Sequence, residues 1–121
     1  TMQEFTTSFE ILDLAEKQLL YKALVAQLKK DFGRVNVDLK IPENPIPEHL
    51  QAELHEKVYR LILEQFPEYL NLLYIVDVPE HKVRQLEAID VVDMAKTVSF
   101  LILKREWTKV SLRKQQGEWS S

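Results

Sequence analysis

The chain has 121 residues, of which 45% are hydrophobic and 29% are charged. This composition is typical of one globular domain and excludes a disordered or fibrous chain. There is no cysteine, so disulfides, zinc–thiolate sites and cysteine nucleophiles are excluded. The two glycines, Gly33 and Gly117, are too far apart to form a glycine-rich phosphate loop, which excludes most nucleotide-dependent enzymes. We therefore predict a single domain over residues 1–121 without a cofactor, with frayed tails at 1–6 and 115–121.

The net charge of −3 is unevenly distributed. Residues 104–114 contain five basic side chains and a single acid, so the rest of the chain is strongly acidic. No apolar run approaches the roughly 18 residues of a membrane-spanning helix. The first residues are polar and acidic, unlike those of a signal peptide. We therefore expect a cytoplasmic protein with no membrane partner.

The first predicted helix begins at a capping box. Residues 7–10 read Thr-Ser-Phe-Glu. The Thr7 hydroxyl can accept a hydrogen bond from the backbone amide of Glu10, and the Glu10 carboxylate can accept one from the backbone amide of Thr7. Neither glycine nor proline follows before Gly33, and leucines recur at helical spacing, which predicts one helix from Thr7 to about Lys30. Gly33 is the predicted stop, because glycine takes the left-handed cap conformation cheaply.

Residues 35–41 alternate strictly between apolar and polar side chains, which is the period of a strand. The apolar members are Val35, Val37, Leu39 and Ile41. A lone strand cannot satisfy its own backbone. Its partner could be a second segment or another subunit, or the segment could be an extended strap over the helices.

Prolines mark the next helices. Pro47 occupies a first-turn position and opens a helix, and Pro67 ends that helix and starts another through residue 76. The second stretch would also suit a strand paired with residues 35–41, but the helix is favoured. Asp77 is the predicted cap of a short further helix.

Asp90 is the predicted cap of the last helix, which should run from about residue 91 to residue 114. Residues 98–103 are apolar on nearly all sides, which indicates a central, buried helix. Ser99 is their polar exception, and we expect its hydroxyl to bond to the carbonyl of Ala95. The predicted fold is mostly α, an irregular four- or five-helix bundle with one extended segment. The alternative is α+β, with segments 35–41 and 72–78 paired as two strands.

Three residues are weak candidates for a metal site. His49, Glu53 and Glu56 share one helix face, and imidazole with carboxylates can bind a transition metal or perform acid–base chemistry. A solvated polar face explains the same residues more simply. A bundle metal site would also need ligands from facing helices, and no second Glu-x-x-His pair is present. We therefore assign no metal.

The basic end of the last helix suggests a nucleic-acid surface. Arg105, Lys109 and Arg113 share a face, and nearby Trp107 could stack on a base. The whole chain is nevertheless acidic, with a pI of about 5.6. A solvated helix face is the simpler interpretation, and nucleic acid is an unlikely partner.

The leading functional prediction is a non-catalytic protein–protein interaction module that associates with itself or with another protein. Catalytic signatures are missing, apolar residues are abundant, and the alternating segment offers a strand edge that could pair across a two-fold axis. An alternative is an enzyme or small-ligand binder with a pocket between helices, with His49, Glu53 and Tyr74 as its polar groups. Nucleic-acid binding is the third. No motif is specific enough to indicate a family. The predicted interaction residues are Val35, Val37, Leu39, Ile41, Arg105, Trp107, Lys109 and Arg113.

Overall fold

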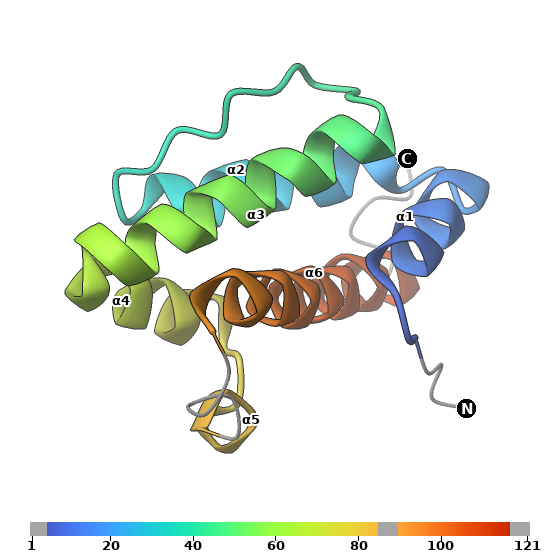
Figure 1. The fold of residues 1–121 in the computed structure, drawn as a ribbon. Helices are drawn as coiled ribbons and strands as arrows, with labels where there is room; N and C mark the ends of the chain where they lie inside the picture. The colour runs from blue at the N-terminus through green and yellow to red at the C-terminus, as the bar shows by residue number, and fades with distance from the viewer. Residues whose placement is uncertain (1–4, 85–89, 117–121) are drawn as a thin grey trace.

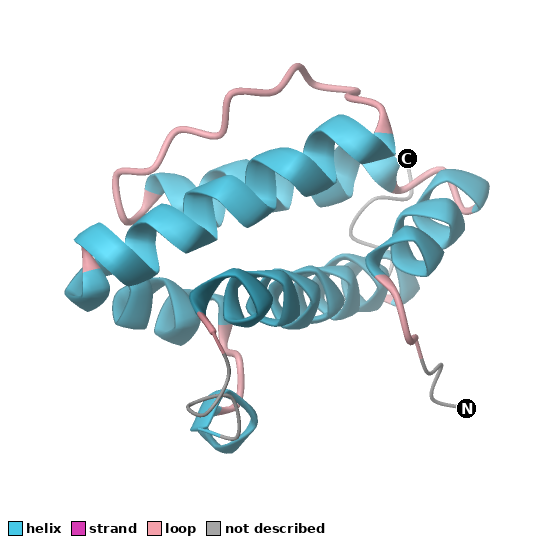
Figure 2. Cartoon of the chain, in the orientation of Figure 1, coloured by secondary structure: helices cyan, strands magenta, loops and turns pink. Residues whose placement is uncertain are grey.

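The computed structural model describes residues 5–84 and 90–116. Within these residues the chain is mainly helical and contains no strand, as Figure 2 shows. The predicted mostly α bundle with one extended segment is confirmed. The alternative with two paired strands is wrong, because residues 72–76 belong to a helix. The helices are α1 (Ser8–Lys17), α2 (Tyr21–Gly33), α3 (Pro47–Glu64), α4 (Phe66–Val76), α5 (Glu80–Arg84) and α6 (Val91–Gln115).

Helix α6 is the element on which the others pack. It contacts α1, α2, α3 and α4 (Figure 1). Val98 and Ile102 are fully buried and Leu103 is nearly so, which confirms that this apolar stretch forms a central helix. The short α5 lies below the other helices in Figure 1, and its Val83 is partly buried against the core. None of the helices in the described part of the chain is long and apolar enough to cross a membrane.

The predicted first helix is in fact two helices, α1 and α2, with a sharp turn at Leu19. Leu19 has φ 60°, the left-handed conformation that usually requires glycine. Its amide donates to the carbonyl of Glu16 (3.1 Å), and the next amide, of Leu20, donates to Ala15 (2.8 Å). This pair of bonds closes α1 in a Schellman motif.

The turn at Leu19 allows both apolar stripes of this region to be buried. Leu12 and Ala15 lie on α1 and Leu24 and Leu28 on α2, and all four are fully buried. If this region formed one straight helix, the two stripes would lie side by side on its surface and would point in different directions. They could not both face the same core. Burying them offsets the roughly 1–2 kcal/mol that a left-handed conformation costs a non-glycine residue.

The ends of α2 and α4 also use left-handed residues other than glycine. The helix α2 ends at Gly33 as predicted, but the left-handed residue is Asn36, with φ 62°. The left-handed residue that closes α4 is Asp77, with φ 71°. Asp77 was predicted to cap the helix after it, and this was wrong: its backbone ends the helix before it. Both asparagine and aspartate tolerate this conformation better than other side chains do.

The segment between α2 and α3 is an extended strap that crosses the top of the bundle in Figure 1. Val35, Leu39 and Ile41 point into the core, each less than a tenth exposed. The alternation in residues 35–41 therefore reflects one face packed on helices and one in solvent. The strap is held by the Tyr21 hydroxyl, which donates to the carbonyl of Pro45 at 2.6 Å.

The side-chain caps predicted at the helix starts at Thr7 and Asp90 are confirmed. The capping box of α1 forms between Thr7 and Glu10. The carboxylate of Asp90 accepts from the amide of Asp93 at 2.9 Å and caps α6. The frayed tails predicted at 1–6 and 115–121 lie mostly outside the described residues, and α6 continues to Gln115. The predicted bond of Ser99 is wrong, because its buried hydroxyl has no hydrogen-bond partner within the described chain.

Candidate functional site

The three weak metal candidates lie on α3 and do not form a site. Glu53 accepts from the backbone amide of Lys40 (2.5 Å), and Glu56 pairs with Arg60 (3.3 Å). The exposed His49 lies in the first turn of the helix. No group of three or more metal-ligating side chains occurs in the described residues. The polar face of α3 is thus occupied by contacts within the chain.

The basic residues of α6 do not form the solvated face that their spacing predicts. Lys109 and Arg113 reach toward α2, where Arg113 donates to the side-chain oxygen of Gln27. Arg105 points elsewhere and pairs with Asp77 at 3.0 Å. Trp107 is only 5% exposed and cannot stack on an incoming base. Two of the three cations therefore stabilise the fold.

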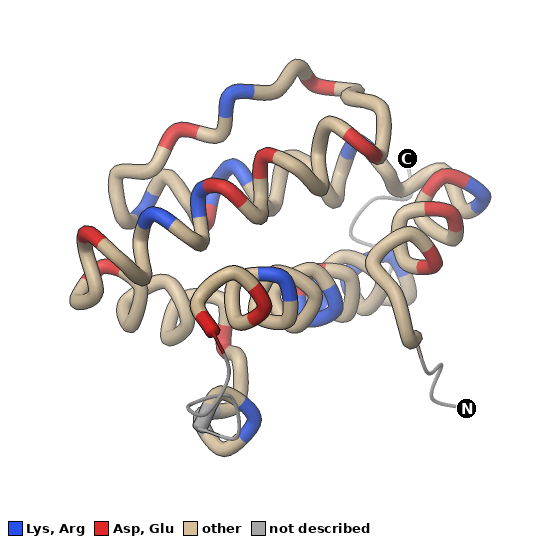
Figure 3. Tube along the Cα trace, viewed as in Figure 1, with Lys and Arg blue, Asp and Glu red and all other residues tan. Residues whose placement is uncertain are grey.

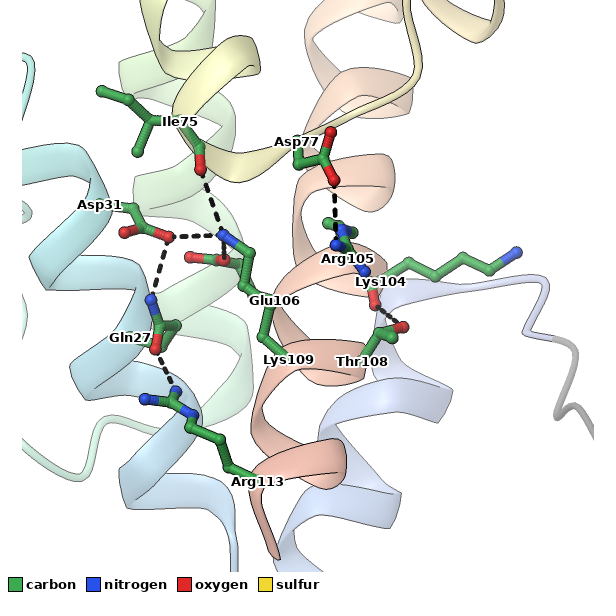
Figure 4. Close-up of polar contacts among 10 residues, drawn as sticks. All are labelled: Gln27, Asp31, Ile75, Asp77, Lys104, Arg105, Glu106, Thr108, Lys109 and Arg113. Carbon is green, nitrogen blue, oxygen red and sulfur yellow. Dashed lines mark hydrogen bonds and ion pairs between the residues drawn. The ribbon is translucent and has the colours of Figure 1, made fainter. Parts of the chain in front are cut away.

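A buried polar cluster lies between α2 and α6, and Figure 4 shows it in close-up. Its centre is the ammonium of Lys109, which is 3.2 Å from a carboxylate oxygen of Asp31 and 3.2 Å from one of Glu106. The same ammonium donates to the backbone carbonyl of Ile75 near the end of α4 (3.3 Å). Gln27 donates to Asp31 at 3.1 Å. The cluster thus joins three helices through one lysine.

Glu106 is a buried acid whose pKa is raised well above its ordinary value. Its side chain is fully buried, and the Lys109 ammonium lies 3.2 Å from one of its oxygens. Burial raises its pKa to about 8, and the adjacent Asp31 carboxylate adds to this more than Lys109 opposes it. Protonated, Glu106 becomes a donor and can bond to Asp31.

Asp31 is the ionised partner of this pair. Its burial acts to raise its pKa, since the residue is only 2% exposed. Hydrogen bonds from Glu106, Gln27 and Lys109 outweigh burial and hold that pKa below its usual value. From these pKa directions we expect one carboxylate, one carboxylic acid and one ammonium in the cluster at neutral pH. Two carboxyl groups with divergent pKa values can perform acid–base chemistry, but their burial keeps a substrate away from these two.

Sequence reasoning missed this cluster, although a signal for it exists. Glu106 stands in the apolar stripe of α6, four residues after Ile102 and four before Val110, both fully buried. Asp31 similarly follows Leu28 on the buried face of α2. A charged residue at a core position of each of two helices is the pattern that predicts a buried pair.

A second feature is an exposed apolar surface on α4, which we call the α4 surface. It consists of Phe66, Leu70 and Tyr74, together with Leu63 at the end of α3. The first three follow at intervals of four residues and share one helix face. They are 47%, 49% and 87% exposed, and Leu63 is 54% exposed. Tyr74 therefore points into solvent and does not line a pocket between helices.

The α4 surface carries no charge. Pro67 and Asn71, also exposed, extend it on the same helix, and the one charged residue of α4, Glu68, is half-buried at its side. Figure 3 shows α4 largely in the tan of uncharged residues. The other large exposed apolar side chains are dispersed: Phe9, Leu19, Ile46, Val92 and Leu112. Single exposed apolar residues are ordinary, whereas a group of them on one helix face is a candidate interaction site.

Comparison with known protein families, with curated proteins and with solved structures gives no match to this chain.

Proposed function

We propose that this chain is a non-catalytic interaction module that forms a homodimer through the α4 surface. The observation that supports this is the contiguous group of exposed apolar side chains on α4. The opposite face of the same helix is already used, because Tyr69 and Leu72 are fully buried in the core. The non-catalytic part is supported by the buried cluster, whose carboxyl groups are out of reach of a substrate.

The strand edge first predicted as the interface is a weaker candidate. Val35, Leu39 and Ile41 are covered by helices of the same chain, so they offer little apolar area to a partner. Trp107 is covered in the same way. We therefore propose that the self-association predicted from the sequence takes place through α4 and not through the strand edge.

The occupant that fits the α4 surface best is a second copy of it. An acidic or basic partner would find no opposite charge there. A two-fold axis through Leu70 would place Phe66 of each copy against Tyr74 of the other, an isologous contact. Aromatic residues at the centre of an interface and an absence of charge there are typical of stable contacts.

The size of the surface agrees with this proposal. At about 200 Å² for each fully exposed side chain, its four residues expose roughly 500 Å². A standard interface buries about 800 Å² on each partner, of which somewhat more than half is apolar. The α4 surface thus supplies about the apolar share of one dimer interface.

The test is sedimentation velocity over a wide concentration range, with two matched variants. Leu70→Glu places two carboxylates at the proposed axis and should leave only monomer. Leu112→Glu is the control, because Leu112 on α6 is similarly exposed at 45% and lies outside the surface; it should leave the dimer intact. A monomeric parent chain, or equal dissociation by both variants, would refute the proposal. Circular dichroism of each variant checks that the helices are retained.

A further inference from the structure

On the side of α6 that faces away from α2, a hollow of about 400 Å³ opens between this helix and the residues after α4. Its lining includes the cations Lys82, Lys104 and Arg105 and one anion, Asp77. Figure 4 shows Asp77, Lys104, Arg105 and Thr108 on this side, away from the buried cluster. Its volume lies within the range of small-ligand pockets, roughly 300–1,000 Å³.

The hollow has an excess of positive charge in an otherwise acidic protein. Lys82 and Lys104 form no ion pair with any residue in 5–84 or 90–116, whereas Lys17, Lys40 and Lys57 each pair with an acid. Arg105 uses one terminal nitrogen on Asp77, and its remaining N–H groups can serve a ligand. Three cations and one anion give a net charge of about +2 at neutral pH.

Asp77 holds this arrangement in place. Its left-handed backbone, with φ 71°, turns the chain at the end of α4 toward α6. Its carboxylate then fixes the guanidinium of Arg105 at 3.0 Å, although 75% of that carboxylate side chain is exposed.

We propose that this hollow binds a small phosphate monoester with an apolar body. The phosphate group carries a charge of about −1.5 to −2 at neutral pH, which matches the charge of the hollow. Its oxygens suit the fork of a guanidinium with two ammonium groups beside it. The apolar body would rest on Val78, which is buried, and on the half-buried Leu101. This inference does not depend on self-association.

Titration calorimetry with phenyl phosphate at low salt tests the proposal. Binding should be measurable with phenyl phosphate, and weaker or absent with inorganic phosphate and with phenol. Lys104→Gln should weaken binding about fivefold, since it removes one partly exposed charge contact. Asp77→Asn should tighten it by a similar factor, because asparagine keeps the left-handed backbone while the competing anion is lost.

The control uses a second hollow, lined by Lys22, Lys29 and Lys30 on α2. Lys30→Gln should leave the affinity unchanged. If Lys30→Gln weakens binding as much as Lys104→Gln does, the ligand is only attracted to lysines, and the proposal is overturned. It is also overturned if phenyl phosphate at millimolar concentration gives no heat, or if Asp77→Asn weakens binding while circular dichroism shows the fold intact. Amide chemical-shift changes should centre on Val78 and Leu101.

Discussion

Replacing Glu106 with glutamine should remove a pH-dependent loss of stability. The pKa of this carboxyl group is about 8 in the folded chain, against 4.5 as its ordinary value. Between these two values the folded state holds a proton that the unfolded state has released. The free energy of unfolding therefore falls as the pH rises through this interval, by about 1.4 kcal/mol per pH unit for this one group. At neutral pH the cost has reached about 3 kcal/mol.

Glutamine cannot ionise, and its amide can donate to Asp31 as the protonated acid does. At about pH 5 the variant Glu106→Gln and the parent chain should therefore unfold with similar free energies. At about pH 8 the variant should be more stable, by about 4 kcal/mol. Urea denaturation at several pH values between these limits gives the two curves. Glu64→Gln, on an exposed glutamate of α3, reports the effect of removing a solvated charge.

The opposite result would identify a different state of the cluster. If Glu106 is ionised and stabilised by Lys109, the glutamine variant loses that ion pair and is the less stable protein at neutral pH. The difference in free energy of unfolding between the variant and the parent chain would then shrink toward acid pH, where residue 106 is uncharged in both proteins. A difference that is the same at every pH would also refute the reasoning, because it would show that Glu106 does not titrate over this range.

Two further substitutions test single features of the fold by urea denaturation. Leu19→Gly should raise the free energy of unfolding by about 1 kcal/mol, because the left-handed residue is 88% exposed and glycine relieves its strain. A loss of stability would show that the leucine side chain has a structural role. Ser99→Ala should also raise the free energy of unfolding by about 1 kcal/mol, because it removes a buried hydroxyl without a hydrogen-bond partner. A loss of stability would indicate that the hydroxyl bonds to the Ala95 carbonyl after all.

Local signals in the sequence account for most of the helices. The prolines at 47 and 67 and the cap at Asp90 each mark the start of a helix that forms, because capping depends on residues within one turn. The break at Leu19 carries no such signal. Leucine is a good helix former, and only the gain from burying stripes on α1 and α2 against α6 explains its left-handed conformation.

The candidate sites were harder to predict, because they depend on contacts between distant segments. Lys109 and Asp31 are 78 residues apart in the chain and meet only when α6 packs on α2. The spacing of Lys109 and Arg113 on α6 gives the helix face they occupy, but not whether that face meets solvent or another helix. The α4 surface was not predicted, because the face of α4 that enters the core is set by its packing on α2, α3 and α6.

The position of α6 in the chain has a consequence for biosynthesis. During translation α1 to α4 emerge before the helix on which all four pack. Until then their apolar faces, including Leu24 and Leu28 of α2 and Leu72 of α4, have no complete core to enter. The domain therefore reaches its native packing only after residues up to about Val110 have left the ribosome. Nascent chains that stop before α6 should expose these faces to chaperones and to aggregation.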